Sequence, residues 1–478
     1  MKHSQNKNKT KTKIVCTLGP STNSLPQVKA LIENGMSVAR LNLSHGTIDD
    51  HKKSVDLVRS ASNELNQPVG VMVDIPGKKY RTGQTRPGSI DIKLHSQIRL
   101  TSADITGSAE MIPVKPPGIH KDAKPGKIIA IADGLVKVKV LEISGEEVLC
   151  EAITPGKISR GRGVNVAGVI PTGEFLNEVT DLAIDFASEI KADFIAISSV
   201  SSASNIESIK EQINTRGINP AIISKIETAE GIRQFKSILA VTDGIMVARG
   251  DMGVEVDLSE VPTIQKRLIK AANIAGKPVI TATQMLESMI SSPSPTRAEV
   301  TDVANAVFDG SDAIMLSGET SIGKYPVESV YMMSKVALEA EKALPYDSML
   351  VEKRIHMEHQ TDDSIAYSSC QTAYQLNAEL IVAFTESGST AARVSKYRPR
   401  STILALTPFQ ETQRRLTLTW GVTPMTTLPV KDVNDFFTIV KEEAHKSPEI
   451  NGEGLVVLVA GLPIGVPGGT NMLRVMSV

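Results

Sequence analysis

The chain has 478 residues, a formal net charge of −1 and 41% hydrophobic residues. This length allows two or three domains with sizeable cores, and the near-neutral charge argues against general binding to nucleic acid or to an acidic membrane surface. No run of 18 apolar residues occurs and the first dozen residues are polar, so the sequence predicts neither a signal peptide nor a membrane span. We expect a cytoplasmic protein whose three cysteines, Cys16, Cys150 and Cys370, are buried free thiols.

Apolar segments rich in β-branched residues recur along the first two thirds of the chain, and they end in polar or charged side chains. Helix-period stretches lie between most of them, for example at 25–34, 181–191, 261–275 and 301–308. Strands that alternate with helices predict parallel βαβ units. Eight such strands predict an α/β protein with a closed (β/α)8 TIM barrel, whose functional residues lie at the C-terminal strand ends. The eight segments are 13–19, 37–43, 69–74, 193–199, 221–227, 244–251, 278–284 and 313–319.

One βα unit is interrupted by a long stretch of strand-like sequence. Its predicted strands, at 90–100, 127–131, 136–143 and 147–153, are punctuated by hairpin signals at Asp133-Gly134 and Ser144-Gly145. We interpret residues 77–168 as an inserted small β-barrel lid domain placed to exclude water from the catalytic face; an insertion without function is the alternative. The barrel would then comprise residues 1–76 and 169–346.

The last third of the chain predicts a separate C-terminal α/β domain, residues 347–478. Strand-like segments lie at 378–385, 402–407, 422–427 and 454–461. Helical patterns lie around and between them, at 362–375, 391–397, 410–420 and 432–446. This domain contains no obvious catalytic group of residues.

Two of the predicted barrel strands end in opposite charges. One ends with Lys225 and Glu227, and the next contains Arg249 and Asp251 at its end. Buried strands that finish in charge are costly unless those charges bind something. Two carboxylates suggest a hard divalent metal, and the adjacent lysine suggests an anionic substrate bridged to it. A structural ion pair is the alternative, which the recurrence of charged strand ends disfavours.

Long segments, in the same order, make the chain similar to the pyruvate kinases over essentially its whole length. The resemblance implies the fold that the strand count predicts. It also implies phosphoryl transfer from phosphoenolpyruvate to ADP, giving pyruvate and ATP through enolpyruvate in the last step of glycolysis, by a homotetramer. The matching segments include TKIVCTLGPST, SVARLNLSHG, IISKIETAEG, DGIMVARGDMGVE, GKPVITATQMLESM and FTESGSTAARVSKYRPR.

The resemblance assigns roles to the charged strand ends. Lys225 would stabilise the transferring phosphoryl group, and Glu227 and Asp251 would hold Mg²⁺ or Mn²⁺. The amides of Gly250 and Asp251, together with the Thr283 hydroxyl, would bind the substrate carboxylate, because exposed N–H groups at a helical turn attract anions.

Further roles follow from the same resemblance. Arg40 would bind the substrate phosphate. A network that includes Thr283, Ser317 and Glu319 would deliver the proton to the methylene carbon. Phosphoryl transfer is mainly positioning and charge neutralisation, which explains why so many cationic and polar groups are needed.

His45, Arg81 and Arg162 would bind the nucleotide. Arg162 stands where a lysine is more usual in the family, which keeps the cation but changes a point charge to a planar fork. For His45 alone, a helix-capping or packing role would be the simpler interpretation, but its place in ARLNLSHG favours the nucleotide role.

The predicted monovalent-cation site departs from the family pattern. Asn42, Ser44, Asp74 and the backbone of Ile75 would hold K⁺ in most members. Here Lys79 replaces a glutamate close to that site, and family members with lysine here tend not to need K⁺. We therefore predict K⁺-independent catalysis; Lys79 pointing into solvent is the alternative.

A second departure is Ser198-Ser199-Val200-Ser201, where the family commonly has Ser-Phe-Val-Arg. Loss of the aromatic side chain predicts an opened pocket wall next to the substrate. A related protein with weak or redirected activity therefore stays open, as does a metal-dependent enolate-forming barrel lyase. The lyase would not be expected to combine the lid domain with Lys225 and Arg162, and retro-aldol turnover without nucleotide would reveal it.

The C-terminal domain contains one anion-binding pattern. Thr385, Ser387, Gly388, Ser389 and Thr390 follow a predicted strand and open a helix, a place where small hydroxyl residues can cradle a phosphate. This resembles the family's loop for a phosphorylated effector, although Ser and Thr at a helix start are also ordinary caps.

Overall fold

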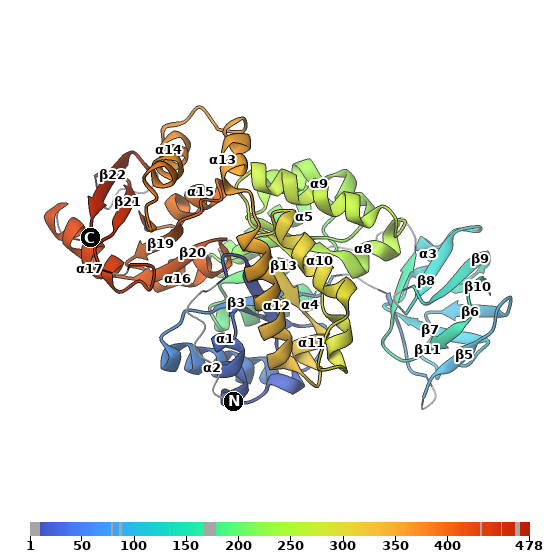
Figure 1. Cartoon of the computed structure of the whole chain (residues 1–478). Coiled ribbons are helices and arrows are strands. Elements are labelled where there is room, and N and C mark those ends of the chain that lie inside the picture. Colours follow the sequence, from blue (N-terminus) through green and yellow to red (C-terminus); the bar gives the residue numbers. More distant parts are fainter. Residues whose placement is uncertain are drawn as a thin grey trace.

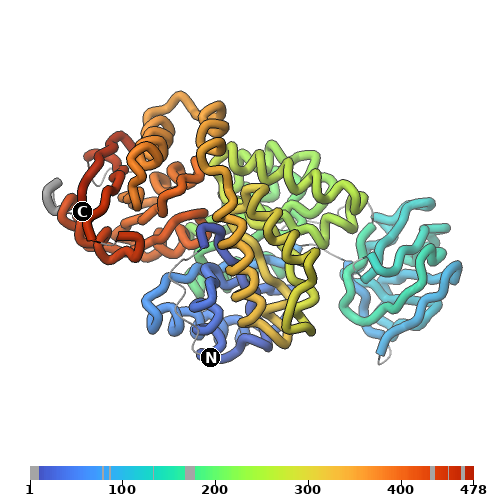
Figure 2. Tube along the Cα trace, viewed as in Figure 1, coloured from blue at the N-terminus to red at the C-terminus, as the bar shows by residue number. Residues whose placement is uncertain are grey.

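Three units make up the protein, and Figure 1 shows them in a row. Within the residues that the computed structural model describes, they are a closed barrel of eight strands, a second closed barrel of seven strands, and a five-stranded sheet. The inserted barrel and the C-terminal unit lie on opposite sides of the central barrel, as the trace in Figure 2 also shows. This confirms the predicted fold class. The described residues are 10–77, 80–85, 88–132, 134–166, 178–430, 433–450, 452–463 and 469–478.

The central barrel consists of eight parallel strands in the order β1-β17-β16-β15-β14-β13-β3-β2. Their apolar residues are largely inaccessible to water, and every residue of β3 is buried. Such strands are typical of parallel sheets that helices cover on the outside. The strands are β1 (Lys13–Thr17), β2 (Met36–Asn42), β3 (Gly70–Ile75), β13 (Phe194–Ile197), β14 (Ala221–Ile226), β15 (Gly244–Ala248), β16 (Val279–Ala282) and β17 (Ala313–Leu316).

Helices follow the strands and form the outer layer. Their apolar faces pack on the outward side chains of the strands in one large hydrophobic cluster. The helices are α1 (Leu25–Glu33), α2 (Ile48–Leu65), α4 (Glu178–Glu189), α5 (Ala203–Thr215), α6 (Ala229–Arg233), α7 (Phe235–Val241), α8 (Arg249–Glu255), α9 (Val261–Ile274), α10 (Arg297–Phe308), α11 (Gly318–Ser321) and α12 (Pro326–Lys342).

The barrel interior explains why polar residues gather at one end. A second cluster of buried apolar side chains fills the interior, among them Val38, Met72, Ala196 and Ile223. Successive side chains of a strand point to opposite faces, so the residue two positions further on also points inward. Those next inward positions, towards the C-terminal strand ends, are Arg40, Asp74, Ser198 and Lys225.

The inserted barrel lies between β3 and α4 and is largely antiparallel. The predicted single strand at 90–100 is wrong, because a turn at His95, with φ of 61°, divides it into β5 and β6. The hairpin predicted at Ser144-Gly145 is confirmed, since Ser144 pairs with Glu147. Asp133 lies outside the described residues. The strands are β4 (Tyr80–Thr82), β5 (Ile90–Ile92), β6 (Gln97–Thr101), β7 (Met111–Lys115), β8 (Ile128–Ile131), β9 (Val136–Ser144), β10 (Glu147–Ala152), β11 (Gly156–Ile158) and β12 (Gly163–Val166), with one short helix, α3 (Ile119–Asp122).

The C-terminal unit contains a sheet in the order β20-β19-β18-β21-β22. Its last strand was not predicted and runs antiparallel to β21. The predicted helix at 410–420 is too long, because the α-helix ends at Arg415 and a 3-10 turn, Leu416–Leu418, follows. The elements are α13 (Tyr346–Arg354), α14 (Thr361–Leu376), β18 (Leu380–Phe384), α15 (Ser389–Lys396), β19 (Thr402–Thr407), α16 (Gln410–Arg415), β20 (Val422–Thr426), α17 (Val433–His445), β21 (Leu455–Ala460) and β22 (Met472–Ser477).

The C-terminal unit contacts the N-terminal ends of the barrel strands. Arg398 Nη1 lies 2.8 Å from Asp312 Oδ1, and Arg414 Nε lies 2.7 Å from Asp193 Oδ1. Leu418 joins the apolar cluster inside the barrel. The opposite, C-terminal ends of the strands therefore face away from this unit and towards the inserted barrel.

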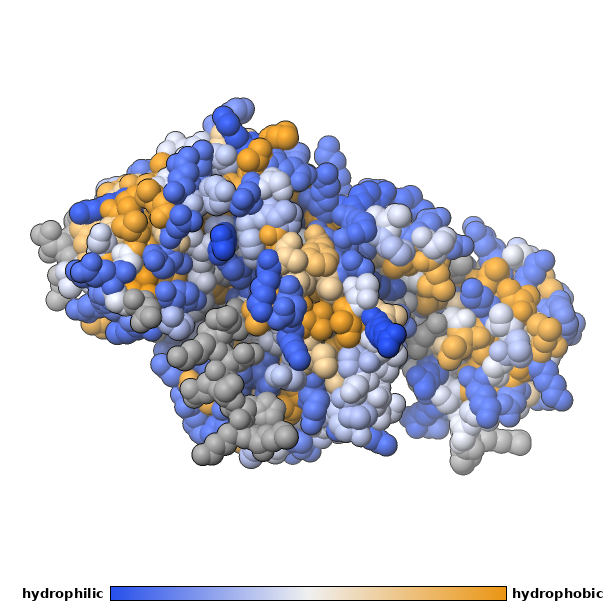
Figure 3. Space-filling model, viewed as in Figure 1, coloured by the Kyte–Doolittle hydropathy of each residue, from blue (hydrophilic) through white to orange (hydrophobic). Residues whose placement is uncertain are grey.

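The chain boundaries of the three units stay predictions. The proposed boundary at 168 lies outside the described residues, and the one at 346 coincides with the first residue of α13. Cys16, Cys150 and Cys370 are buried free thiols, as predicted. None of the described helices is long and apolar enough to cross a membrane. On the face seen in Figure 3, apolar residues are scattered among hydrophilic ones over all three units.

Candidate functional site

A cavity of about 240 Å³ lies between the C-terminal end of the barrel and the inserted barrel. The structure brings together here eight residues predicted for the substrate, metal, cation and nucleotide sites. They are Arg40, Asn42, Ser44, His45, Arg81, Arg162, Lys225 and Asp251. The inserted barrel also comes close to α8 here, because a Cβ added to Gly134 would lie 3.9 Å from Val254 Cγ2.

Asp74 organises the charges at the bottom of the cavity. Its Oδ2 accepts a hydrogen bond of 2.8 Å from Arg40 Nε and lies 2.6 Å from Arg40 Nη2, while its Oδ1 lies 3.3 Å from Lys225 Nζ. Burial by itself raises the pKa of Asp74, but Arg40 and then Lys225 outweigh this effect and hold the pKa below its ordinary value. Asp74 therefore stays ionised and fixes both cations in place.

We expect Asp74→Asn to destabilise the protein in a pH-dependent way. A carboxyl group whose pKa is lowered by folding stabilises the protein fully at pH values above its pKa in the unfolded chain. This stabilisation is lost as the pH falls towards and through its pKa in the folded protein. Removal of one partner from a buried ion pair costs about 3–5 kcal/mol. The melting temperatures of the two proteins should differ most at pH 7. Their difference should shrink below about pH 3.9, the ordinary Asp pKa. A difference that stays constant down to pH 3 would contradict this origin.

Lys225 and Glu227 are held by two consecutive serines that follow β13. Lys225 Nζ donates to Ser198 Oγ at 2.7 Å. Glu227 Oε1 accepts from the amide of Ser199 at 2.8 Å and from its hydroxyl at 3.2 Å. Glu227 Oε2 lies 3.5 Å from Lys225 Nζ, and Glu227 is only 1% exposed. Ser199 itself is buried, and the opening of the pocket wall stays a prediction.

Thr283 is held in a strained conformation just beyond β16. Its φ is 70°, a left-handed value that is rare for a β-branched residue and is seen at functional sites. Its hydroxyl accepts from the amide of Gly250 at 2.8 Å and donates to Ala282 O at 2.6 Å. Thr283 and Gly250 are therefore adjacent, as the predicted carboxylate site requires, but this amide already has a partner.

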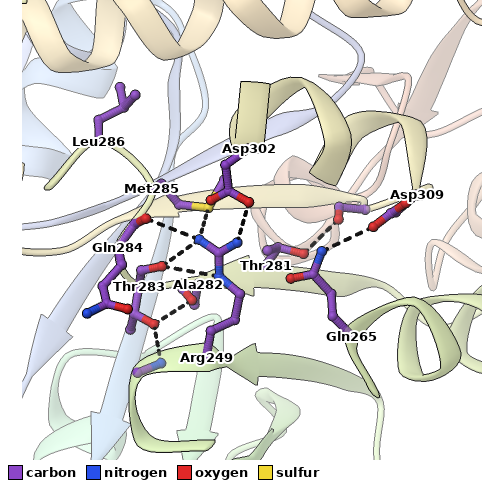
Figure 4. Close-up of polar contacts among 12 residues, drawn as sticks. Arg249, Gln265, Thr281, Ala282, Thr283, Gln284, Met285, Leu286, Asp302 and Asp309 are labelled. Atoms are coloured by element: carbon purple, nitrogen blue, oxygen red, sulfur yellow. Dashed lines mark hydrogen bonds and ion pairs between the residues drawn. The ribbon is translucent and has the colours of Figure 1, made fainter. Parts of the chain in front are cut away.

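Arg249 supports the turn that contains Thr283, as Figure 4 shows. Its Nη2 donates to Thr283 O at 2.7 Å, and its Nη1 lies 2.8 Å from Asp302 Oδ1 on α10. The guanidinium thus ties the start of α8, directly after β15, to the loop after β16. No functional role was predicted for Arg249, although its position at the end of an apolar run was a usable signal.

Ser317 follows β17 directly, and Glu319 is the second residue of α11. Glu319 is buried, and its carboxylate accepts from the amides of Ser317 at 2.7 Å and Leu286 at 3.1 Å. The Ser317 hydroxyl has no hydrogen-bond partner among the described residues. Glu319 thus has a structural reason to be present, and the proton network through these residues stays a prediction.

The residues predicted to bind nucleotide line the inserted-barrel side of the cavity and its edge. Burial lowers the pKa of His45, and the nearby Arg81 and Arg40 lower it further, so the neutral imidazole is favoured. Arg81 Nη1 donates to Gly161 O at 3.0 Å, and Arg162 Nε donates to Ser159 Oγ at 3.1 Å. Both guanidinium groups keep further N–H donors that can reach a bound polyanion.

The residues predicted for a monovalent cation lie at the ends of the neighbouring strands β2 and β3, where Asn42 pairs with Asp74. Asn42 Oδ1 accepts from the amide of Ser44 at 3.2 Å, and both residues line the cavity. Ile75 is the last residue of β3 and is 2% exposed. Lys79, on which the K⁺ prediction rests, lies outside the described residues.

The predicted effector loop joins β18 to α15. Thr385 Oγ1 accepts from the amide of Gly388 at 2.9 Å, Ser387 Oγ lies 3.1 Å from Ser389 Oγ, and the buried Thr390 hydroxyl lies 2.8 Å from that of Thr470. Gly388 has a φ of 94°, which suits a residue without a side chain. Effector binding here stays a prediction, because these hydroxyls already have partners in the chain.

The carboxylates present fit a hard divalent metal of the kind used in phosphoryl transfer. Among the described residues, no three His, Cys, Asp or Glu side chains form a metal-binding group. Mg²⁺ is commonly held by one or two carboxylates together with substrate oxygens and water. Glu227 beside Lys225, and Asp251 in the cavity lining, supply that smaller set.

Comparisons with known proteins agree with this geometry. Family models described as "Pyruvate kinase, barrel domain" and "Pyruvate kinase, alpha/beta domain" match residues 9–330 and 363–476. The chain is 39% identical over 470 residues to a pyruvate kinase of Clostridium acetobutylicum, covering 98% of this chain and 99% of that protein. It is 40% identical over 467 residues to a pyruvate kinase of Staphylococcus aureus strain MRSA252, covering 97% and 80%.

A solved structure extends the similarity to the fold. The crystal structure of a pyruvate kinase from Cryptosporidium parvum has a TM-score of 0.90 and 36% sequence identity, and the match covers 98% of this chain and 96% of that one. Two family models, and relatives that match over nearly the whole chain, thus agree with a cavity lined by Arg40, Lys225 and Asp251. The chain belongs to the pyruvate kinase family, whose members are phosphotransferases.

Proposed function

We propose that this protein transfers the phosphoryl group of phosphoenolpyruvate to ADP and forms pyruvate and ATP through enolpyruvate, with Mg²⁺ or Mn²⁺. The observation that carries the proposal is the position of Lys225 in the cavity between the two barrels, beside Arg40 and opposite Arg81 and Arg162. Phosphoryl transfer between two anions requires cations on both sides of the moving group. The cavity supplies them from both walls.

Each residue would contribute by charge and position. Arg40, fixed by Asp74 and by a 2.8 Å hydrogen bond to Thr17 Oγ1, would bind the substrate phosphate. Lys225 would stabilise the charge that develops on the transferring group. The Thr283 turn would orient the substrate carboxylate. Glu227 and Asp251 would hold the divalent metal, which would supply positive charge to offset that of the substrate.

The nucleotide would bind against Arg81 and Arg162, near His45. Because the inserted barrel carries both arginines, its approach to the central barrel would bring their positive charge to the phosphates and exclude water. The proton that converts enolpyruvate to pyruvate would reach the methylene carbon through Thr283, Ser317 and Glu319. In this relay Glu319 also accepts hydrogen bonds from the backbone amides of Leu286 and Ser317.

We also propose that catalysis is independent of K⁺. Lys79 replaces a glutamate in the sequence near the predicted cation site. Asp74, one of the predicted K⁺ ligands, is already neutralised by Arg40 and Lys225. Pyruvate formation should therefore proceed equally well when K⁺ is replaced by tetramethylammonium at constant ionic strength. Activation by K⁺ of tenfold or more would overturn this proposal and leave the reaction itself standing.

The same assay tests the function. Pyruvate formation that requires phosphoenolpyruvate, ADP and Mg²⁺ would support the kinase. Ligand binding without turnover would instead favour a related protein of weak or redirected activity, to which Ser199 in place of an aromatic residue points. Assembly as a homotetramer, a cytoplasmic location and a phosphorylated effector at Thr385–Thr390 stay predictions.

A further inference from the structure

Ser199 is a residue of the site to which the reaction assigns no role. It follows β13 by two positions, is 6% exposed, and its hydroxyl points towards Glu227 on the neighbouring strand. A Cβ on Gly77 would come within 2.5 Å of Ser199 Oγ, so the chain that leads into the inserted barrel packs tightly on this serine. Gly77 therefore has no space for a side chain beside Ser198 and Ser199.

Ser199 makes two contacts with a single carboxylate oxygen. Its amide and its hydroxyl lie 2.8 and 3.2 Å from Glu227 Oε1. The second oxygen, Oε2, is on the side of Lys225 Nζ, 3.5 Å away. Two donors on Oε1 fix the rotation of the carboxylate plane. They therefore hold Oε2 on the side of Lys225, which lines the cavity.

The backbone conformation and contacts of the turn after β13 hold Ser199 next to Glu227. Its φ is 56°, which non-glycine residues adopt only when the surroundings hold them there. The backbone oxygen of the next residue, Val200, accepts a hydrogen bond of 3.3 Å from the hydroxyl of Thr228, which is the residue directly after Glu227. A Cβ on Gly231 would come within 2.4 Å of Val200 O. The turn after β13 is therefore locked against the turn after β14, which contains Glu227.

We propose that Ser199 is a positioning residue that orients the Glu227 carboxylate for the divalent metal through its amide and its hydroxyl. The inference rests on the proposed function, because Glu227 is a metal ligand only in that function. Groups that orient a metal ligand through a hydrogen bond typically change metal affinity by 10–100-fold when they are removed.

The test is direct binding of Mn²⁺ to the full-length protein without phosphoenolpyruvate or ADP, followed by electron paramagnetic resonance of the free ion. Ser199→Ala and Ser199→Gly both remove the hydroxyl, but glycine also relieves the left-handed backbone. Ser201→Ala is the matched control, because the Ser201 hydroxyl contacts Asn205 Oδ1 at 2.9 Å instead of Glu227. Thermal unfolding without metal checks that each variant is folded.

We expect both Ser199 variants to bind Mn²⁺ about tenfold more weakly, and the Ser201 variant to bind as the unmodified chain does. If Ser199 has only a structural role, its substitution would lower the melting temperature and leave the Kd for Mn²⁺ unchanged. That result would overturn the inference. Normal affinity in Ser199→Gly alone would also overturn it, because backbone strain would then be the cause. Failure of the proposed function can be distinguished from failure of this inference. In that case the unmodified chain would form no pyruvate, whatever its affinity for Mn²⁺.

Discussion

Lys225→Met is expected to reduce phosphoryl transfer by about 10³-fold or more while the protein remains folded. The ammonium group is aimed at the charge that develops in the transition state, where a preorganised donor is worth most. Methionine has a similar length and retains the packing of the aliphatic stem. The loss should appear mainly in kcat, because an interaction made only in the transition state does not contribute to substrate binding.

The fold of this variant can be checked independently of its activity. Asp74 loses one of its two cations but retains Arg40 and the Ser198 hydroxyl at 3.2 Å, so the melting temperature should fall only moderately. Lys236→Met, at an exposed position of α7, is the control for loss of one positive charge and should retain normal turnover. A kcat within tenfold of normal in Lys225→Met would refute the role assigned to Lys225.

The barrel could be predicted from sequence because its strands obey one simple rule. Each strand is a short apolar run with β-branched residues, and each ends where inward positions change from apolar to polar. Met72 precedes Asp74 and Ile223 precedes Lys225 in this way. Periodicity and the position of charges are local properties, so they are visible without the fold.

Other parts of the fold depend on contacts that local sequence does not show. The turn at His95 has no glycine or proline to mark it, and its amide bonds with Ala152 O at 2.8 Å in a strand more than fifty residues away. The helix that begins at Gln410 changes to a 3-10 turn because Leu416 and Leu418 are buried, Leu418 in the barrel interior. Tertiary packing overrides local propensity at both places.

The residues of the site that were missed also depend on contacts that local sequence does not show. Lys225, Glu227 and Asp251 were found because charge after an apolar run is conspicuous. Ser199 was seen only as a departure from a family pattern, and Ser198, which fits that pattern, was given no role. A serine has no charge to mark it, and its importance depends on whether the fold brings a carboxylate or an ammonium group within hydrogen-bonding distance.

Glu227→Gln should weaken Mn²⁺ binding by at least 100-fold and reduce turnover at ordinary Mg²⁺ concentrations to a comparable extent. Glutamine retains an oxygen for the two Ser199 donors, which preserves the turn after β13. It removes the negative charge that a hard divalent cation requires, and it places a neutral group beside Lys225. Binding of Mn²⁺ and the Mg²⁺ dependence of pyruvate formation are the measurements; an unchanged Kd for Mn²⁺ would exclude Glu227 as a ligand.

A double-mutant cycle connects this prediction to Ser199. If Ser199 acts on the metal only through Glu227, then Ser199→Ala should weaken Mn²⁺ binding in the normal chain and have little further effect once Glu227 is glutamine. Residues in direct contact are expected to show such non-additivity, whereas independent residues have additive effects. Additive losses would show that Ser199 reaches the metal site by another route. Non-additive losses would identify the Ser199 hydroxyl and the Glu227 carboxylate as one functional unit, assembled from the ends of two adjacent barrel strands.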